Sequence, residues 1–272
     1  MMLALILGLA AELDANAPIA CAGEHRQGAM IVCRSTPGAQ VQLGDVAIDV
    51  DEHGWVVLGH DRDADAATQL SVTTPDGGVY ERLIVVEQRE YDIQRIEGVA
   101  PRFVSPPAET LERRQREGAQ KAAAYRSDWD GAGFAGGFVM PIEGGRITGV
   151  YGSQRFYNGE PRRPHYGIDV AAPNGTPVTA PAGGVVTLAE PDMYWEGGLI
   201  FIDHGQGFTS AFLHLSEVIV EVGDVVEQGQ SIGAVGAGGR STGAHLDWRI
   251  KWRDRYIDPG ETLGVDPAAL AD

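Results

Sequence analysis

The chain alternates short hydrophobic runs with breaks rich in glycine, proline and aspartate, which is the pattern of β-strands joined by tight turns. Between residues 28 and 98 the runs are rich in β-branched side chains, and turn signals such as Thr36-Pro37-Gly38 separate them. Short strands at this spacing predict a small β-sandwich. The runs cover residues 30–33, 41–43, 46–50, 55–58, 69–72 and 83–86.

A different pattern follows this region. Pro101, Pro106 and Pro107 mark a boundary. Residues 108–125 are rich in Glu, Arg, Gln and Ala, a composition that favours a helix. The apolar face of this helix is thin, so we predict a solvated connector rather than a core element.

From about Gly136 the chain returns to short β-type runs that glycines punctuate heavily, and no long helical pattern appears. This predicts an antiparallel β-domain with tight turns, and a mainly β fold for the whole chain. The pattern divides the chain into a segment resembling a signal peptide at 1–16, a β-sandwich-like domain at 17–99, a proline-bounded connector with a helix at 100–134, an antiparallel β-domain at 135–262 and a tail at 263–272.

The N-terminal residues 1–11 form an unbroken apolar run. Its length fits the hydrophobic part of a signal peptide and is too short to span a bilayer as a helix, although no basic residue precedes it. We expect an exported protein; an ordinary N-terminal strand or helix is the alternative. Cys21 and Cys33 could staple a hairpin in an oxidising compartment, or they could be two unrelated buried thiols.

The charge of the chain excludes two classes of partner. The formal net charge is -17, whereas binding to nucleic acid or to an anionic membrane requires a basic surface. Nearly all the cations are arginines, because Lys121 and Lys251 are the two lysines of the chain.

Candidate chemistry lies in three short motifs of the last 110 residues. His165 and Asp169 form an H-x-x-x-D pair, His214 stands alone in an apolar run, and His245 and Asp247 form an H-x-D pair. Imidazole and carboxylate groups are the usual ligands of a catalytic zinc ion, which keeps one position open for water. These five residues therefore supply enough groups for a metal ion and for acid–base chemistry beside it.

Each motif has a plainer interpretation when it is taken alone. On a strand, His245 and Asp247 share one face, which could simply be wet. His165 and Asp169 could form a hydrogen-bonded pair, and His214 could be a core histidine. Three further histidines, which lie in or near turns of the N-terminal region, are expected at the surface: His25, His53 and His60.

The motifs together resemble the LytM/lysostaphin-like zinc endopeptidases, which cut peptide bonds in bacterial peptidoglycan. The resemblance covers roughly residues 138–259, and both the order and the spacing of the motifs agree. The matching text is Gly149-Val150-Tyr151-Gly152, Pro164-His165-Tyr166-Gly167-Ile168-Asp169, Ala180-Pro181-Ala182-Gly183, Phe212-Leu213-His214-Leu215-Ser216 and Gly243-Ala244-His245-Leu246-Asp247.

The resemblance implies a role for each residue. His165, Asp169 and Asp247 would bind one divalent metal ion, most simply Zn²⁺, and His214 and His245 would be catalytic. The departure is Asp247, where the family usually has histidine. Aspartate is a competent ligand, but it adds a negative charge and loosens the preference for zinc over harder ions.

The implied function is hydrolysis of peptide cross-links in peptidoglycan by a periplasmic or otherwise exported protein. The partners would be stem peptides and, in addition, other cell-wall proteins. One alternative is a catalytically degenerate module that binds or activates a cell-wall amidase. A second alternative is a biotinyl or lipoyl carrier, suggested by the turn at residues 223–230, but neither lysine lies at a hairpin tip.

Overall fold

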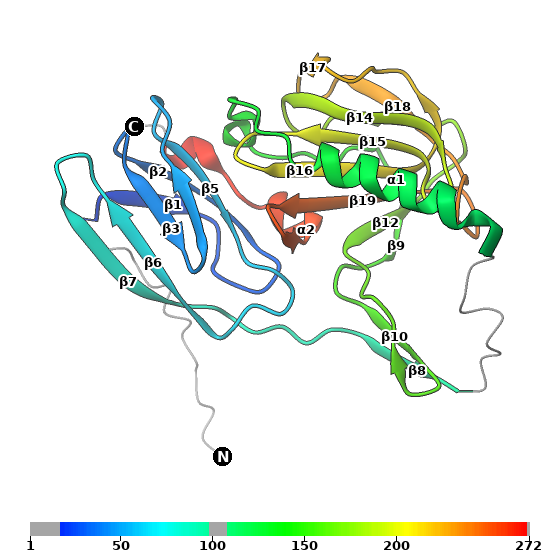
Figure 1. Cartoon of the computed structure of the whole chain (residues 1–272), viewed down its shortest axis with the longest axis horizontal. Helices are drawn as coiled ribbons and strands as arrows, with labels where there is room; N and C mark the ends of the chain where they lie inside the picture. The colour runs from blue at the N-terminus through cyan, green and yellow to red at the C-terminus, as the bar shows by residue number, and fades with distance from the viewer. Residues whose placement is uncertain (1–16, 98–107, 271–272) are drawn as a thin grey trace.

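The computed structural model describes residues 17–97 and 108–270, and it is mainly β, as the sequence predicts (Figure 1). The segment resembling a signal peptide and the three boundary prolines lie outside the described residues. Within the described ranges, no helix is both long enough and apolar enough to cross a membrane.

The N-terminal region forms two antiparallel sheets, with strand orders β1-β2-β5 and β4-β3-β6-β7. All six runs predicted as strands are strands in the structure. The buried faces of both sheets contribute to one hydrophobic cluster, as expected for a small sandwich. The bounds are β1 Ile19–Ala22, β2 Met30–Ser35, β3 Gln40–Leu43, β4 Val46–Asp49, β5 Trp55–Gly59, β6 Ala67–Thr73 and β7 Val79–Val85.

A disulfide fastens the first hairpin. Cys21 and Cys33 lie opposite each other in the β1–β2 ladder, and their sulfurs are bonded. Of the two alternatives for these cysteines, the structure therefore shows the staple. Disulfides persist in oxidising compartments such as the periplasm.

The C-terminal region is built on a ten-stranded sheet whose main path is β17-β14-β15-β16-β19-β12-β9, with antiparallel neighbours throughout. This confirms the predicted antiparallel β-domain. The bounds are β9 Arg146–Gly149, β12 Gly167–Ala171, β13 Pro177–Thr179, β14 Gly184–Met193, β15 Gly197–Asp203, β16 Phe208–Val218, β17 Val225–Val226, β18 Ser231–Val235, β19 His245–Trp252, β20 Arg255–Ile257 and the short helix α2 Pro259–Thr262.

Hydrogen bonds, as well as the connecting chain, join the N-terminal and C-terminal regions. Strand β8 (Ile93–Ile96) pairs in parallel with β10 (Gln154–Tyr157), and β10 also pairs with β11 (Glu160–Pro161). The Gln206 side chain bonds the backbone of β5 at Trp55 and Val57. The sandwich and the C-terminal domain therefore share hydrogen bonds as well as one core cluster.

Helix α1 (Leu111–Ala124) is the predicted connector helix, and it lies along the large sheet (Figure 1). Most of its side chains are exposed, in agreement with the thin apolar face. Glu117 and Ala124 are buried, however, and the next residue, Tyr125, packs on Phe201 with ring centroids 4.4 Å apart. The end of the helix therefore covers part of the sheet face, which the sequence did not indicate.

Polar contacts hold α1 in this position. Arg113 pairs with Asp192, and Glu117 accepts a hydrogen bond from the backbone N–H of Tyr194. Lys121 pairs with Glu196. All three partners on the sheet side belong to β14 or to the turn after it, so the helix is tied to one edge of the sheet face.

The expectation that His25 and His60 lie at the surface is wrong. His60 is 2% exposed, and its Nε2 atom lies 2.9 Å from Nδ1 of half-buried His25. Burial lowers the pKa of His25 to about 4, with help from Arg82. Burial also lowers the pKa of His60 to about 3, assisted by His25 and Arg255. Both side chains are therefore neutral in the folded protein at neutral pH.

We expect acid to destabilise the protein through this pair. In the unfolded chain a histidine takes up its proton near pH 6.5, so between about pH 6.5 and 4 the unfolded state binds more protons than the folded state. The free energy of unfolding must then fall as the pH falls through this range. Replacing His60 with Gln should weaken this dependence of the unfolding free energy on pH. Urea denaturation at several pH values measures it. His53→Gln, at an exposed position, should leave the dependence unchanged.

Candidate metal centre

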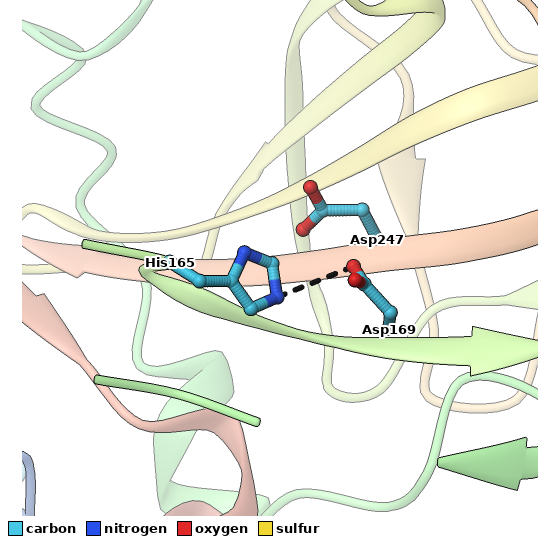
Figure 2. A group of neighbouring side chains, drawn as sticks. All are labelled: His165, Asp169 and Asp247. Atoms are coloured by element: carbon cyan, nitrogen blue, oxygen red, sulfur yellow. Dashed lines mark ion pairs between the residues drawn. The ribbon is translucent and has the colours of Figure 1, made fainter. Parts of the chain in front are cut away.

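Strand pairing brings the five candidate residues to one place. Asp169 on β12 lies directly opposite Asp247 on β19, and Asp247 in turn lies opposite Leu213 on β16. Residues directly opposite each other in an antiparallel pair point to the same face. His165 immediately precedes β12, and His245 begins β19. Figure 2 shows His165, Asp169 and Asp247 converging on a common point.

The geometry of these three side chains fits a divalent cation. One ligand atom from each of His165, Asp169 and Asp247 lies within 4.8 Å of the other two. His165 Nε2 is 3.2 Å from Asp169 Oδ1, yet both atoms are buried without a well-formed hydrogen bond to any described residue. Buried polar atoms are rarely left in this state. Two such atoms facing each other are expected of ligands to a shared ion.

Glycines make room for the two carboxylates. A Cβ atom at Gly149 would lie 2.2 Å from Oδ2 of Asp169, and one at Gly167 would lie 2.8 Å from Oδ1 of Asp247. A side chain at Gly149 would push Asp169 out of the cluster, and one at Gly167 would also meet the Trp248 carbonyl oxygen at 2.5 Å and so push β12 away from β19. The H-x-x-x-D motif is therefore constrained at Gly167 as well as at His165 and Asp169.

The surroundings of Asp169 favour its charged form. Burial of the side chain acts to raise the pKa of its carboxyl group, but the close approach of His165, together with His245 and Arg249, outweighs burial and lowers this pKa. A charged carboxylate is the form that binds a cation.

His214 occupies a strained backbone position beside the cluster. Its φ is 65°, in the left-handed region that a non-glycine residue rarely adopts. Its backbone N–H donates to the carbonyl of Glu196, and its Nδ1 lies 2.8 Å from the carbonyl oxygen of Gly238. A carbonyl oxygen can only accept, so Nδ1 carries the proton and Nε2 keeps its lone pair. Strain of this kind is concentrated at functional sites.

His245 is oriented in the same way. Its Nδ1 lies 2.8 Å from the carbonyl oxygen of Gly243 and 3.2 Å from Ser241 Oγ. Its Nε2 is 3.8 Å from Asp169 Oδ1, and its ring centroid is 4.8 Å from that of His214. The two histidines thus lie side by side next to the metal-binding cluster. Burial lowers the pKa of His214, which keeps that ring neutral at pH 7.

The sequence analysis missed Arg249. Its guanidinium group donates hydrogen bonds to both oxygens of the Asp247 carboxylate. The Nε atom lies 3.0 and 3.1 Å from the two oxygens, and a terminal nitrogen lies 2.5 Å from Oδ2. The signal was available, because residues 247 and 249 must share a face of one strand. Compared with the neutral histidine that the motif resemblance implies at this position, an aspartate paired with an arginine leaves the net charge of the cluster unchanged.

Arg249 does not block Asp247 from a metal ion. A carboxylate has about four lone-pair directions, so it can accept hydrogen bonds from arginine and still offer an oxygen to a cation. His204, by contrast, belongs to the core: it is fully buried, and both ring nitrogens lie within hydrogen-bonding distance of partners, the Gly183 carbonyl and Ser210 Oγ.

An antiparallel β-domain with a histidine–carboxylate cluster and two further histidines beside it defines a metallopeptidase-type protein. The family model of peptidase family M23 matches residues 163–259. A crystal structure from Pseudomonas aeruginosa that carries the M23 name is 30% identical, covers 89% of this chain and 96% of its own, and superposes with a TM-score of 0.69. The chain belongs to peptidase family M23, which confirms the resemblance inferred from its motifs.

Two curated relatives match part of this chain. Peptidoglycan DD-endopeptidase ShyA of Vibrio cholerae is 40% identical over 95 residues, which is 35% of this chain and 22% of that protein. DD-carboxypeptidase/endopeptidase Mpg of Neisseria meningitidis is 35% identical over 144 residues, which is 50% of this chain and 33% of that protein. The matches thus span about a fifth to a third of the length of these relatives.

We predict that Arg249 stabilises the metal-free protein. Asp247 is 3% exposed, so Arg249→Gln leaves a buried carboxylate without its cation and should lower the free energy of unfolding by about 3 kcal/mol. Arg249→Lys keeps the charge but not the forked contact, and should recover part of the loss. Urea denaturation of chelator-treated protein measures both effects.

A metal ion should partly replace the missing charge. Zinc is therefore expected to raise the unfolding free energy of Arg249→Gln more than that of the wild type. Equal stability of the wild type and Arg249→Gln without metal would show that the arginine does not neutralise Asp247.

Proposed function

We propose that this protein is a metal-dependent endopeptidase that hydrolyses peptide cross-links in bacterial peptidoglycan. The observation that carries the proposal is the cluster of His165, Asp169 and Asp247, with two buried ligand-type atoms facing each other without a well-formed hydrogen bond. Membership of family M23 and the names of the relatives ShyA and Mpg support the substrate class. Stem peptides are the proposed binding partners.

The proposed ligands of the ion are His165, Asp169 and Asp247. A set of one nitrogen and two oxygen donors suits Zn²⁺, and the arginine-compensated charge brings the site close to the usual His/Asp/His set. When bound, the ion would polarise the scissile carbonyl group and make a water molecule more acidic. We propose zinc as the resident ion.

The two remaining histidines would handle the protons. Both hold their Nδ1 proton against a backbone carbonyl, so each presents an unprotonated Nε2 to the site. We assign His245, the nearer to Asp169, as the base that accepts the proton of the attacking water. His214 would hydrogen-bond the developing oxyanion through Nε2 as an imidazolium that takes its second proton from solvent before the reaction; burial lowers its pKa, which makes this form a strong donor but scarce at neutral pH.

The proposed location is the periplasm or another exported compartment. The substrate named for the relatives lies outside the cytoplasm, and the bonded pair Cys21–Cys33 suits an oxidising environment. The degenerate amidase-activating module remains the second candidate, because Asp247 departs from the usual family residue. That module would hold no metal ion at stoichiometric level.

Two substitutions separate metal binding from catalysis. We expect His165→Ala to abolish stoichiometric zinc and hydrolysis together, because it removes a ligand. His214→Ala should keep the zinc and lower kcat by a factor of about 10² or more. His53→Ala, at an exposed position far from the cluster in sequence, is the matched control and should change neither quantity.

The measurements are metal content of the purified proteins and mass spectrometry of defined muropeptides incubated with and without a chelator. Hydrolysis at the wild-type rate by His214→Ala would remove that residue from the mechanism. A wild-type protein with neither bound metal nor any product would favour the degenerate module.

A further inference from the structure

A cavity of about 760 Å³ lies between the end of α1 and the sheet face that carries the metal centre. Its floor includes Leu199, Phe201 and Leu213 from β15 and β16, and Tyr125 at the end of α1 forms part of its wall. The cavity adjoins the cluster directly, because Arg249 both lines it and binds Asp247, and Leu213 lies opposite Asp247 in the sheet.

The charge of this cavity is opposite to that of the protein. Six cations line it, against the three carboxylates of Asp128, Glu196 and Asp254. Even after Arg249 is set against Asp247, two positive charges remain in excess, whereas the whole chain carries -17. The six cations are Lys121, Arg126, Arg163, Arg249, Lys251 and Arg253. Both lysines of the chain are among them.

Aromatic rings, rather than carboxylates, position several of these cations. The Arg163 guanidinium lies over the rings of Tyr166 and Tyr256, 5.3 and 5.1 Å from their centroids, and donates to the Tyr256 hydroxyl at 2.6 Å. The Lys251 ammonium lies 4.8 Å from the centroid of the Tyr125 ring, although it also approaches Asp254 at 3.4 Å. A ring holds a cation in place without cancelling its charge.

Three of the four lining arginines, Arg126, Arg163 and Arg253, have no carboxylate partner within 4.0 Å among the described residues. These guanidinium groups can therefore accept an anion in the cavity. Arginine is suited to this task because its planar fork matches a carboxylate with two parallel hydrogen bonds.

We propose that this cavity is a subsite for a carboxylate group of the peptide substrate, carried by a residue near the scissile bond. Arg163 binds the carboxylate, Lys251 and Arg253 in the same lining add positive charge, and the apolar floor takes the aliphatic part of the same residue. This inference rests on the proposed peptidase function and adds a requirement to it: the substrate must carry a free carboxylate beside the bond that is cut.

The test compares two peptides that differ in one group. Both have the cross-linked sequence of a stem-peptide substrate, and one carries a carboxamide in place of the free carboxylate. We expect the wild type to hydrolyse the acid with a kcat/KM at least about tenfold higher, as losing a charge-assisted hydrogen bond implies. In the Arg163→Gln/Arg253→Gln protein the preference should fall below about twofold, through KM rather than kcat.

A matched control removes two positive charges elsewhere. Arg95 and Arg116 are exposed arginines that do not line the cavity, and the Arg95→Gln/Arg116→Gln protein should keep the full preference. Metal content is measured for every variant, because Arg163 is close in sequence to His165. A preference that survives in Arg163→Gln/Arg253→Gln with normal metal content overturns the subsite.

A binding experiment separates this inference from the proposed function. The affinity of both peptides is measured by fluorescence anisotropy with chelator-treated wild-type protein, which cannot use the metal ion. Tighter binding of the acid supports the subsite even if neither peptide is ever cut. Equal binding of acid and amide overturns it, even if both peptides are hydrolysed.

Discussion

The structure depends on two carboxylates being held side by side. The β12–β19 register places Asp169 directly opposite Asp247, and like charges at such a cross-strand pair repel each other. Both side chains are largely withdrawn from water, which makes the repulsion stronger. The fold tolerates the pair because cationic or cation-binding groups surround it: His165 on one side, Arg249 on the other, and space for an ion between them.

This constraint bears on the proposed ligand set of His165, Asp169 and Asp247. An aspartate in place of histidine would leave an extra negative charge at the site, and Arg249, two residues further along the same strand face, compensates for it. The two residues act as one unit that has the charge of a neutral imidazole. Asp247, the departure that the resemblance implies, is therefore accompanied by Arg249, which lies outside the H-x-D motif.

The surroundings of the site combine parts from inside and outside the family match. The M23 model covers residues 163–259, and those residues supply all five members of the candidate site. Helix α1 and Tyr125 lie before that range, yet they cover part of the sheet face and enclose the basic cavity. The basic cavity of this chain therefore depends on a connector that the motifs alone do not describe.

The sequence by itself determined most strands of the sandwich, the connector helix and the identity of the clustered residues, but not strand β12, which carries Asp169. Strand alternation and turn residues are local signals, and the H-x-x-x-D and H-x-D spacings are local as well. Prediction from the sequence failed where long-range packing decides whether a residue is buried. His60 lies next to a turn signal, but the packing of residue 25 against residue 60 buries it.

Only the tertiary structure decided the register that sets Asp169 against Asp247, the grip of Arg249 on that carboxylate, and the position of α1 over the sheet. Register depends on pairing between segments some 80 residues apart in the sequence, and a shift of one residue would turn every side chain to the other face. Local patterns state which face a residue shares with its neighbours along the strand. They contain no information about which residue lies across from it.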